Sequence, residues 1–255
     1  MIRVDDDGDV RTVTLARPEQ RNAVTPAGLE ALADAVPGAE TPVVHLRGAG
    51  EAFCAGADRS VVADLAAAVD DDDGTVDDGA DDIGADDNAG DAVESFVHRG
   101  QATADAIADA EAVVVAGVDG PARGGGVELA LACDVRVATP EATFAEPGVG
   151  FGLFGAWGGT ARLPEVVGLG EAMDLSLSGR VIDAETARRV GLVSRVVDRP
   201  AAVAAELADN DPAAMQRLKR RLRDRRSAAA QADADVEAFR ELVAANAADL
   251  RNLDD

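Results

Sequence analysis

A strand, a glycine-rich turn and the start of a helix are predicted in succession within residues 113–134, which read VVVAGVDGPARGGGVELALACD. Glycines let the backbone approach a ligand closely. The first turn of a helix also presents unpaired N–H groups and the positive end of the helix dipole to an anion. We therefore expect the N–H of Gly125 to face an oxyanion, although the three glycines also suit a tight, closely packed turn. Their spacing does not fit the G-x-G-x-x-G dinucleotide fingerprint, so nothing here indicates NAD.

A second turn of this kind occupies residues 48–58, GAGEAFCAGAD, between a predicted strand over 43–46 and a predicted helix over 60–69. Turns that follow neighbouring strands of an open sheet can meet at one edge, where α/β folds bind ligands. Two N–H groups that converge there would form an oxyanion hole. The sequence thus predicts a site made largely of backbone amides.

Short β-type runs alternate with helix-compatible stretches through the first two thirds of the chain. The predicted strands cover 10–15, 43–46, 113–118 and 135–138, with helices over 27–36 and 101–110 between them. This alternation favours an α/β fold with a mainly parallel sheet. After Gly168 the pattern is largely helical, over 171–177, 184–190, 200–208, 211–226 and 233–251. We therefore predict an α/β core over 1–168 and a helical C-terminal subdomain over 169–255.

Residues 70–91 hold eleven Asp and no Lys or Arg. Such dense like charge and low hydrophobicity do not offset the entropy of ordering, so a flexible surface loop is expected there. A calcium loop is the alternative. With Gly74 as its sixth residue, an EF-hand would need acids at Val69 and Ala80, and neither is acidic.

Composition excludes several functional classes. The net charge of −24 argues against nucleic acid and anionic membranes as partners. We expect the basic run 217–226, RLKRRLRDRR, to pair with acids of its own chain or of a neighbouring subunit. The two cysteines and two histidines form no disulfide framework and no metal-ligand spacing. A soluble cytoplasmic protein is expected, and one Lys among 24 cations with surplus Asp and Glu suggests a halophilic source.

Five ordered blocks of the chain resemble the crotonase superfamily, which contains the enoyl-CoA hydratases and isomerases. The three central blocks are FCAGAD at 53–58, GGGVELALACD at 124–134 and FAEPGVGFGLFGAWGGTARLPEVVG at 144–168. RPEQRNAVT at 17–25 and LSGRVIDAETARRVGLVSRVV at 177–197 resemble the opening and following blocks. The resemblance covers nearly the whole chain.

What the resemblance implies is a spiral core of ββα repeats with a C-terminal helical subdomain that assembles trimers, alone or paired into hexamers. The implied ligand is an acyl-CoA thioester, whose enolate is stabilised with no metal and no further cofactor, because coenzyme A is part of the substrate. Matched by position, the oxyanion donors fall on Ala57 and Gly125, and the catalytic acid/base falls on Glu128. The other positions expected along the substrate are Arg21, Ala55, Gly56, Asp58, Arg59, Gly124 and Gly148.

Each charged position also has a structural alternative. Glu128 lies in the first turn of its predicted helix, where a carboxylate can simply stabilise the helix end. Arg21 and Arg59 are candidates for contacts with the CoA phosphates. On so acidic a protein, they could equally balance nearby acids.

The chain departs from the family pattern at two acidic positions. Where hydratases carry a second glutamate after proline, this chain has Gly148, and the acid used by some isomerases and dehalogenases is replaced by Ala156. Glu146 is a possible compensating acid. It lies two residues earlier, about 7 Å away along an extended segment.

These departures leave the reaction open. A single carboxylate slightly favours double-bond isomerisation over hydration, because moving one proton between two carbons is the simpler task. Thioester hydrolysis and decarboxylation through the same enolate are alternatives. A catalytically degraded member that only binds acyl-CoA, or serves as a structural subunit, is a further one.

Overall fold

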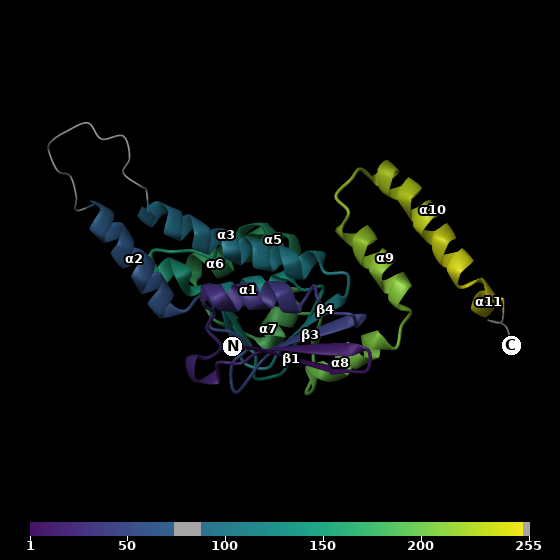
Figure 1. Cartoon of the computed structure of the whole chain (residues 1–255), viewed down its shortest axis with the longest axis horizontal. Helices are drawn as coiled ribbons and strands as arrows, with labels where there is room; N and C mark the ends of the chain where they lie inside the picture. The colour runs from purple at the N-terminus through teal and green to yellow at the C-terminus, as the bar shows by residue number, and fades with distance from the viewer. Residues whose placement is uncertain (74–87, 252–255) are drawn as a thin grey trace.

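The computed structural model describes residues 1–73 and 88–251, whose elements are labelled in Figure 1. The main sheet has six strands in the order β1-β2-β3-β4-β6-β9, and only β1 and β2 pair antiparallel. Its strands are β1 (Ile2–Asp7), β2 (Val10–Leu15), β3 (Val43–Gly48), β4 (Val113–Val118), β6 (Val135–Ala138) and β9 (Arg195–Val196). The four predicted strands and the mainly parallel sheet are thus confirmed.

A second, three-stranded sheet lies next to the glycine-rich turn after β4. It has the order β5-β7-β8, from β5 (Pro121–Arg123), β7 (Thr143–Ala145) and β8 (Ile182–Asp183). The parallel β5–β7 pairing sets Arg123 opposite Ala145. Residues 124 and 146, which follow these strands, therefore start from adjacent points of the backbone.

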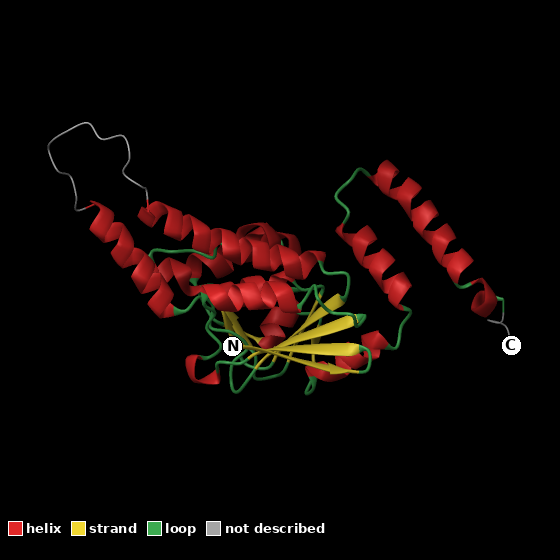
Figure 2. Cartoon of the chain, in the orientation of Figure 1, coloured by secondary structure: helices red, strands yellow, loops and turns green. Residues whose placement is uncertain are grey.

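Helices cover both faces of the main sheet because its central strands are apolar on both sides. From β3, Val44 and Leu46 enter the larger core, whereas Val43 packs in a smaller cluster with Val203 of α8. Helices α1 and α3 lie above the sheet in the view of Figure 2, and α8 lies below it. The helices of the body are α1 (Pro26–Ala35), α2 (Arg59–Asp73), α3 (Asn88–Asp109), α4 (Gly125–Ala132), α5 (Gly159–Val167), α6 (Leu169–Ser178), α7 (Ala184–Arg189) and α8 (Pro200–Ala208), with short 3₁₀ helices η1 (Pro18–Gln20) and η2 (Pro147–Phe151).

The acidic segment differs at its ends from the predicted loop over 70–91. Residues 70–73 belong to α2 and residues 88–91 belong to α3, so both helices extend further than expected. The Asp-rich sequence is tolerated in these helices although its charge density favours a loop. The centre of the predicted loop, 74–87, lies outside the described residues.

The chain beyond residue 168 also contributes strands that the sequence pattern does not predict. β8 joins the small sheet, and β9 completes the main sheet beside β6. Each has only two residues, too few to show an alternating pattern. The last helices are α9 (Pro212–Arg223), α10 (Ala228–Ala245) and α11 (Ala247–Leu250). Helix α9 contacts β4, whereas α10 and α11 lie away from the sheets, as Figure 1 shows.

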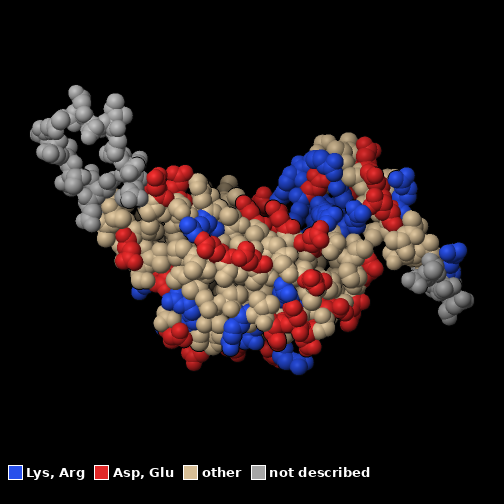
Figure 3. All heavy atoms as spheres, in the orientation of Figure 1, with Lys and Arg blue, Asp and Glu red and all other residues tan. Residues whose placement is uncertain are grey.

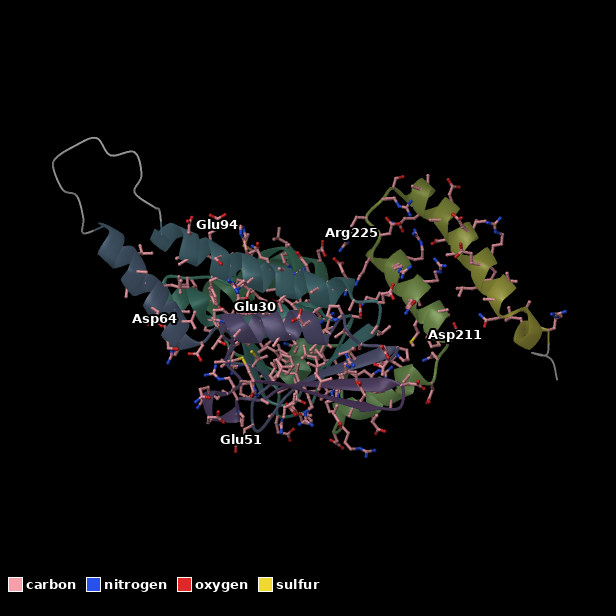
Figure 4. All side chains as sticks on the ribbon, in the orientation of Figure 1. Glu30, Glu51, Asp64, Glu94, Asp211 and Arg225 are labelled. Atoms are coloured by element: carbon pink, nitrogen blue, oxygen red, sulfur yellow. The ribbon has the colours of Figure 1, made fainter. Side chains whose placement is uncertain are left out.

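Helix α9 is held to the body by ion pairs. Figure 3 shows basic side chains gathered over α9 and the loop after it. Asp134 binds Lys219 over 2.8 Å and Arg223 over 2.7 Å. Arg225, labelled in Figure 4, pairs with Glu165 of α5 over 2.6 Å. The expected pairing of the basic run with acids is therefore confirmed.

None of the helices in the described ranges 1–73 and 88–251 has both the length and the apolar character needed to cross a membrane.

Candidate active site

The two glycine-containing turns predicted to meet are joined by backbone hydrogen bonds. Cys54 N–H donates to the carbonyl oxygen of Pro121 over 3.2 Å, and Arg123 N–H donates to that of Cys54 over 2.9 Å. The turn after β3 therefore runs beside the segment that leads into α4. On its other side, Val24 N–H donates to the carbonyl oxygen of Gly56 over 2.8 Å.

Ala57 and Gly125 each present a free backbone N–H where these turns meet. Neither N–H has an acceptor among the residues that the structure describes. Gly125 is the first residue of α4, so its N–H has no partner within the helix. Gly56 has φ +85°, and a β-carbon there would lie 3.1 Å from the nitrogen of Gly125 and 2.7 Å from the carbonyl oxygen of Arg123. The turn can approach α4 this closely because residue 56 is glycine.

Glu128 lies one turn into α4, with only 2% of its surface exposed. Its Oε1 accepts hydrogen bonds from the N–H groups of Trp157, over 2.8 Å, and Gly159, over 2.7 Å. Burial raises the pKa of the Glu128 carboxyl, while these two bonds and the charge of Arg162 oppose the rise. The carboxylate is therefore fixed in position and more basic than an exposed glutamate.

Trp157 is a site residue that the sequence analysis did not identify. Its indole fills the space beside Gly125, where a β-carbon would lie 2.3 Å from the ring. It also packs edge-on against Phe96 of α3, with ring centroids 5.7 Å apart. One residue thus supports both Glu128, through its backbone, and Gly125, through its ring. The available signal was a lone Trp between glycines, in GAWGG at 155–159.

Glu146 follows β7 directly and lies beside the start of α4. The carbonyl oxygen of Ala145 accepts a hydrogen bond from Gly124 N–H over 3.0 Å. Glu146 Oε1 is buried, and no hydrogen-bond partner lies within reach of it in the described part of the chain. Burial raises the pKa of Glu146 to about 9, with a further contribution from the negative charge of Glu128.

Gly148 and Ala156 stand at the two positions where the family pattern has an acidic residue. A β-carbon at Gly148 would lie 2.9 Å from the carbonyl oxygen of Leu153, because the chain closes a tight turn there with a Leu153 N–H to Gly148 oxygen bond of 2.9 Å. The carbonyl oxygen of Ala156 accepts a hydrogen bond from the Gln101 side chain over 3.0 Å. Gly148 thus belongs to the 148–153 turn, and Ala156 directly precedes Trp157, whose N–H binds Glu128.

The remaining predicted positions lie around the same turns. Ala55 N–H donates to the carbonyl oxygen of Arg21 over 2.9 Å, so Arg21 is close to the Gly56 turn. Arg59 begins α2 and lies over the ring of Phe151, 5.7 Å from its centroid. Both arginines are exposed.

Asp58 has a structural role in this arrangement. It pairs with Arg17 over 2.6 Å and accepts hydrogen bonds from the N–H and the hydroxyl of Ser60. Arg17 and Ser60 accordingly lower the pKa of the Asp58 carboxyl. Asp58 thus holds the start of α2 and leaves the neighbouring Ala57 amide free.

Other reactive groups do not add to the site. Burial raises the pKa of both Cys54 and Cys133 to about 12, so these thiols stay protonated and unreactive at neutral pH. Within the described ranges, no three His, Cys, Asp or Glu side chains are grouped so that they could hold a metal ion.

Known proteins resemble the chain over about three quarters of its length in sequence and over 95% of it in structure. The short-chain-enoyl-CoA hydratase of Clostridium acetobutylicum is 34% identical over 198 residues, 75% of this chain and 67% of the relative. The crystal structure of enoyl-CoA hydratase from Bacillus anthracis superposes with a TM-score of 0.80 at 29% identity, covering 95% of this chain and 90% of the other. A Thermobifida fusca protein, solved in complex with acetoacetyl-CoA, has a TM-score of 0.79 at 28% identity and covers 95% and 94%.

The family assignment rests on a match that extends beyond the individual blocks. The sequence profile described as Enoyl-CoA hydratase/isomerase matches residues 5–250, which include both turns, α4 and the helices after the sheets. The crotonase fold expected from the sequence is confirmed by the superposed structures. The chain belongs to the enoyl-CoA hydratase/isomerase family and is an enzyme of that type.

Proposed function

We propose that this enzyme binds an acyl-CoA thioester and stabilises its enolate between the N–H groups of Ala57 and Gly125. The observation that carries the proposal is that these two amides lack acceptors in the described chain and lie on turns in direct contact. A thioester oxygen that becomes negative gains most from donors already in place, because they need no reorganisation as charge develops. The amide of Gly125 also stands at the positive end of α4.

Glu128 is the acid/base of this proposal. It lies three residues beyond Gly125 on the same helix, and its Oε1 is held by two backbone N–H groups. A fixed, buried carboxylate can take a proton from water or from a carbon next to the thioester. Its raised pKa strengthens it as a base while leaving it less acidic than an exposed glutamate. A purely structural role at the helix end does not require a side chain with 2% exposure.

The CoA part of the substrate explains the nearby cations. Arg21 and Arg59 are exposed beside the Ala57 turn and offer charge to the CoA phosphates on a protein of net charge −24. The Thermobifida fusca relative, solved with acetoacetyl-CoA, supports a ligand of this class. Enolate stabilisation by amides and a carboxylate requires no metal and no further cofactor.

Self-association is the second part of the proposal. Helix α10 has no buried residue in the isolated chain, and Val236, Phe239 and Val243 on it are exposed. Exposed apolar side chains on a projecting helix are typical of a subunit contact. The occupant is a second copy of this chain, in a trimer or a dimer of trimers. Light scattering after gel filtration tests this: Phe239→Glu should lower the mass, with Arg240→Glu, its exposed neighbour, as control.

The surface composition fits a cytoplasm of high ionic strength. With 48 acidic and 24 basic residues, the folded chain repels itself at low salt, and counterions relieve that repulsion. The thermal midpoint should therefore rise with potassium chloride concentration. A midpoint that falls as salt is added would contradict a halophilic origin.

The experiment that tests the enzymatic proposal follows crotonyl-CoA in high salt with purified wild type and Glu128→Gln. The wild type should consume the conjugated enoyl thioester or shift its double bond. The variant should be about 10²- to 10⁴-fold slower, as expected for loss of a general acid/base. Release of free thiol or carbon dioxide would instead favour hydrolysis or decarboxylation.

A binding-only protein is the remaining candidate, favoured by Gly148 and Ala156. It predicts that crotonyl-CoA binds tightly to wild type and to Glu128→Gln alike while turnover stays at the uncatalysed rate. Isothermal titration with the same two proteins separates this outcome from catalysis.

A further inference from the structure

Hydration of a 2-enoyl thioester requires two proton transfers on the same side of the substrate. A base must take a proton from water as its oxygen adds to C3, and an acid must deliver a proton to C2. One carboxylate can perform the first of these steps. If the reaction is hydration, Glu128 alone leaves the site without a second proton-transfer group. The inference below rests on the proposed enolate-stabilising function.

Glu146 is a second carboxyl group beside the start of α4, close enough for the charge of Glu128 to act on it. The Ala145 oxygen to Gly124 N–H bond of 3.0 Å joins the end of β7 to the start of the helix that carries Glu128. The pairing of β5 with β7, which connects residues about twenty positions apart, creates this contact. Glu146 therefore reaches the start of α4 from a different element than the one that carries Glu128.

Glu146 is half-buried, and one of its carboxyl oxygens lacks a partner in the described part of the chain. Its Oε1 is inaccessible to solvent and has no partner among the described residues, whereas Oε1 of Glu128 accepts two hydrogen bonds. Buried polar atoms are nearly always paired, so an unpaired buried carboxyl oxygen in a site suggests a functional use. Among the described residues, the charged group that acts on Glu146 is Glu128. Burial raises the pKa of Glu128 itself, and the Gly159 and Trp157 amides and the charge of Arg162 oppose that rise.

We propose that Glu146 is the proton donor of a carboxyl pair with Glu128, and that the site thereby hydrates 2-enoyl-CoA thioesters. Glu128 is the ionised member of the pair, because Trp157 and Gly159 donate to it. Glu146 is the neutral member, because its buried Oε1 accepts no hydrogen bond from the described residues. Burial and the charge of Glu128 both raise the pKa of Glu146, to about 9, which agrees with this division of roles.

The reaction balances with one shared proton and one water. Glu128 takes a proton from water while the water oxygen forms a bond to C3. The π electrons of the C2=C3 bond move towards the thioester oxygen, which Ala57 and Gly125 hold as the enolate. Glu146 then gives its proton to C2, and the 3-hydroxyacyl thioester is complete. The pair ends with the proton on Glu128, and its transfer to Glu146 restores the starting state.

The first test compares crotonyl-CoA hydration by wild type, Glu146→Gln, Glu128→Gln and the control Glu141→Gln. Glu141 is exposed five residues earlier in the chain and should have no effect. Glu146→Gln keeps the shape but cannot donate an acidic proton, so kcat should fall about 100-fold or more with KM little changed. Wild-type activity should decline as the pH rises through about 9, where Glu146 loses its proton, and Glu146→Asp should restore part of the rate.

The outcomes separate this inference from the proposed function. If Glu128→Gln is inactive while Glu146→Gln hydrates at the wild-type rate, the pair is wrong and the enolate function stands. If wild type does not act on any enoyl thioester, both are wrong. An infrared spectrum at pH 7 gives an independent readout: the protein should show a protonated carboxyl band that Glu146→Gln lacks, and absence of that band in wild type would overturn the proposal.

Discussion

The backbone N–H of Trp157 donates to Oε1 of Glu128 over 2.8 Å, and the indole of the same residue fills the space beside Gly125. The base and one of the free amides are therefore supported by a single side chain and its backbone. Trp157 in turn packs against Phe96 of α3, with ring centroids 5.7 Å apart. Helix α3 is thus connected to both parts of the candidate site.

Trp157→Ala should destabilise the protein by about 3–5 kcal/mol, because it leaves a cavity between α3 and α4. The N–H that holds Glu128 remains in the variant, so the pH dependence of activity should change less than the stability. Urea unfolding in high salt measures the first effect and a pH profile of kcat measures the second. Trp157→Phe retains a ring and should lose less stability, and equal losses for the two variants would contradict a packing role.

Gly125→Ala tests whether the start of α4 tolerates a side chain. Its β-carbon would lie 2.3 Å from the Trp157 ring, so the ring or the helix must shift, at a cost of about 1–3 kcal/mol. A shift of the Gly125 amide should also lower kcat more than it raises KM, because oxyanion donors act mainly in the transition state. Gly150→Ala is the matched control, since no atom lies within 4 Å of its β-carbon. Similar kinetics for both variants would contradict the role of Gly125.

Glu146→Gln should change how stability depends on pH. The pKa of Glu146 is raised from 4.5 to about 9 in the folded state, so between these values the folded chain keeps a proton that the unfolded chain releases. The free energy of unfolding of wild type therefore falls as the pH rises through this window. In Glu146→Gln this part of the fall is absent, because Gln does not titrate. Melting curves between pH 5 and about 9 should show the variant gaining relative to wild type. Parallel curves would show that Glu146 titrates normally.

The sequence predicts the parts of the site that depend on local structure. Gly125 begins α4 as expected, because glycines and an apolar run mark that boundary, and β4 covers the predicted residues 113–118. The position of Glu146 beside α4 depends on the β5–β7 pairing, which no local pattern reveals. Trp157 is likewise placed by packing against α3 and not by its neighbours in sequence. The roles of Ala57, Gly125 and Glu128 in catalysis stay predictions until the variants are measured.

Gly148→Glu places a carboxylate where related hydratases carry their second glutamate, and it separates two accounts of this chain. If the site simply lacks a second acid, the new glutamate should raise hydration of crotonyl-CoA. If Glu146 already serves, the variant should gain nothing. A β-carbon at residue 148 would lie 2.9 Å from the Leu153 carbonyl oxygen, so the 148–153 turn must open, at a cost of about 1–3 kcal/mol.

The double variant Gly148→Glu with Glu146→Gln makes this comparison decisive. We expect Gly148→Glu alone to be slower and less stable than wild type, because its β-carbon clashes with the Leu153 carbonyl oxygen. We expect the double variant to be slower still, because it also lacks the proton of Glu146. Initial rates with crotonyl-CoA and urea midpoints for all four proteins measure both effects. A double variant as active as wild type would mean that a carboxyl group at either position can supply the proton. The buried position of Glu146 would then not be required for hydration.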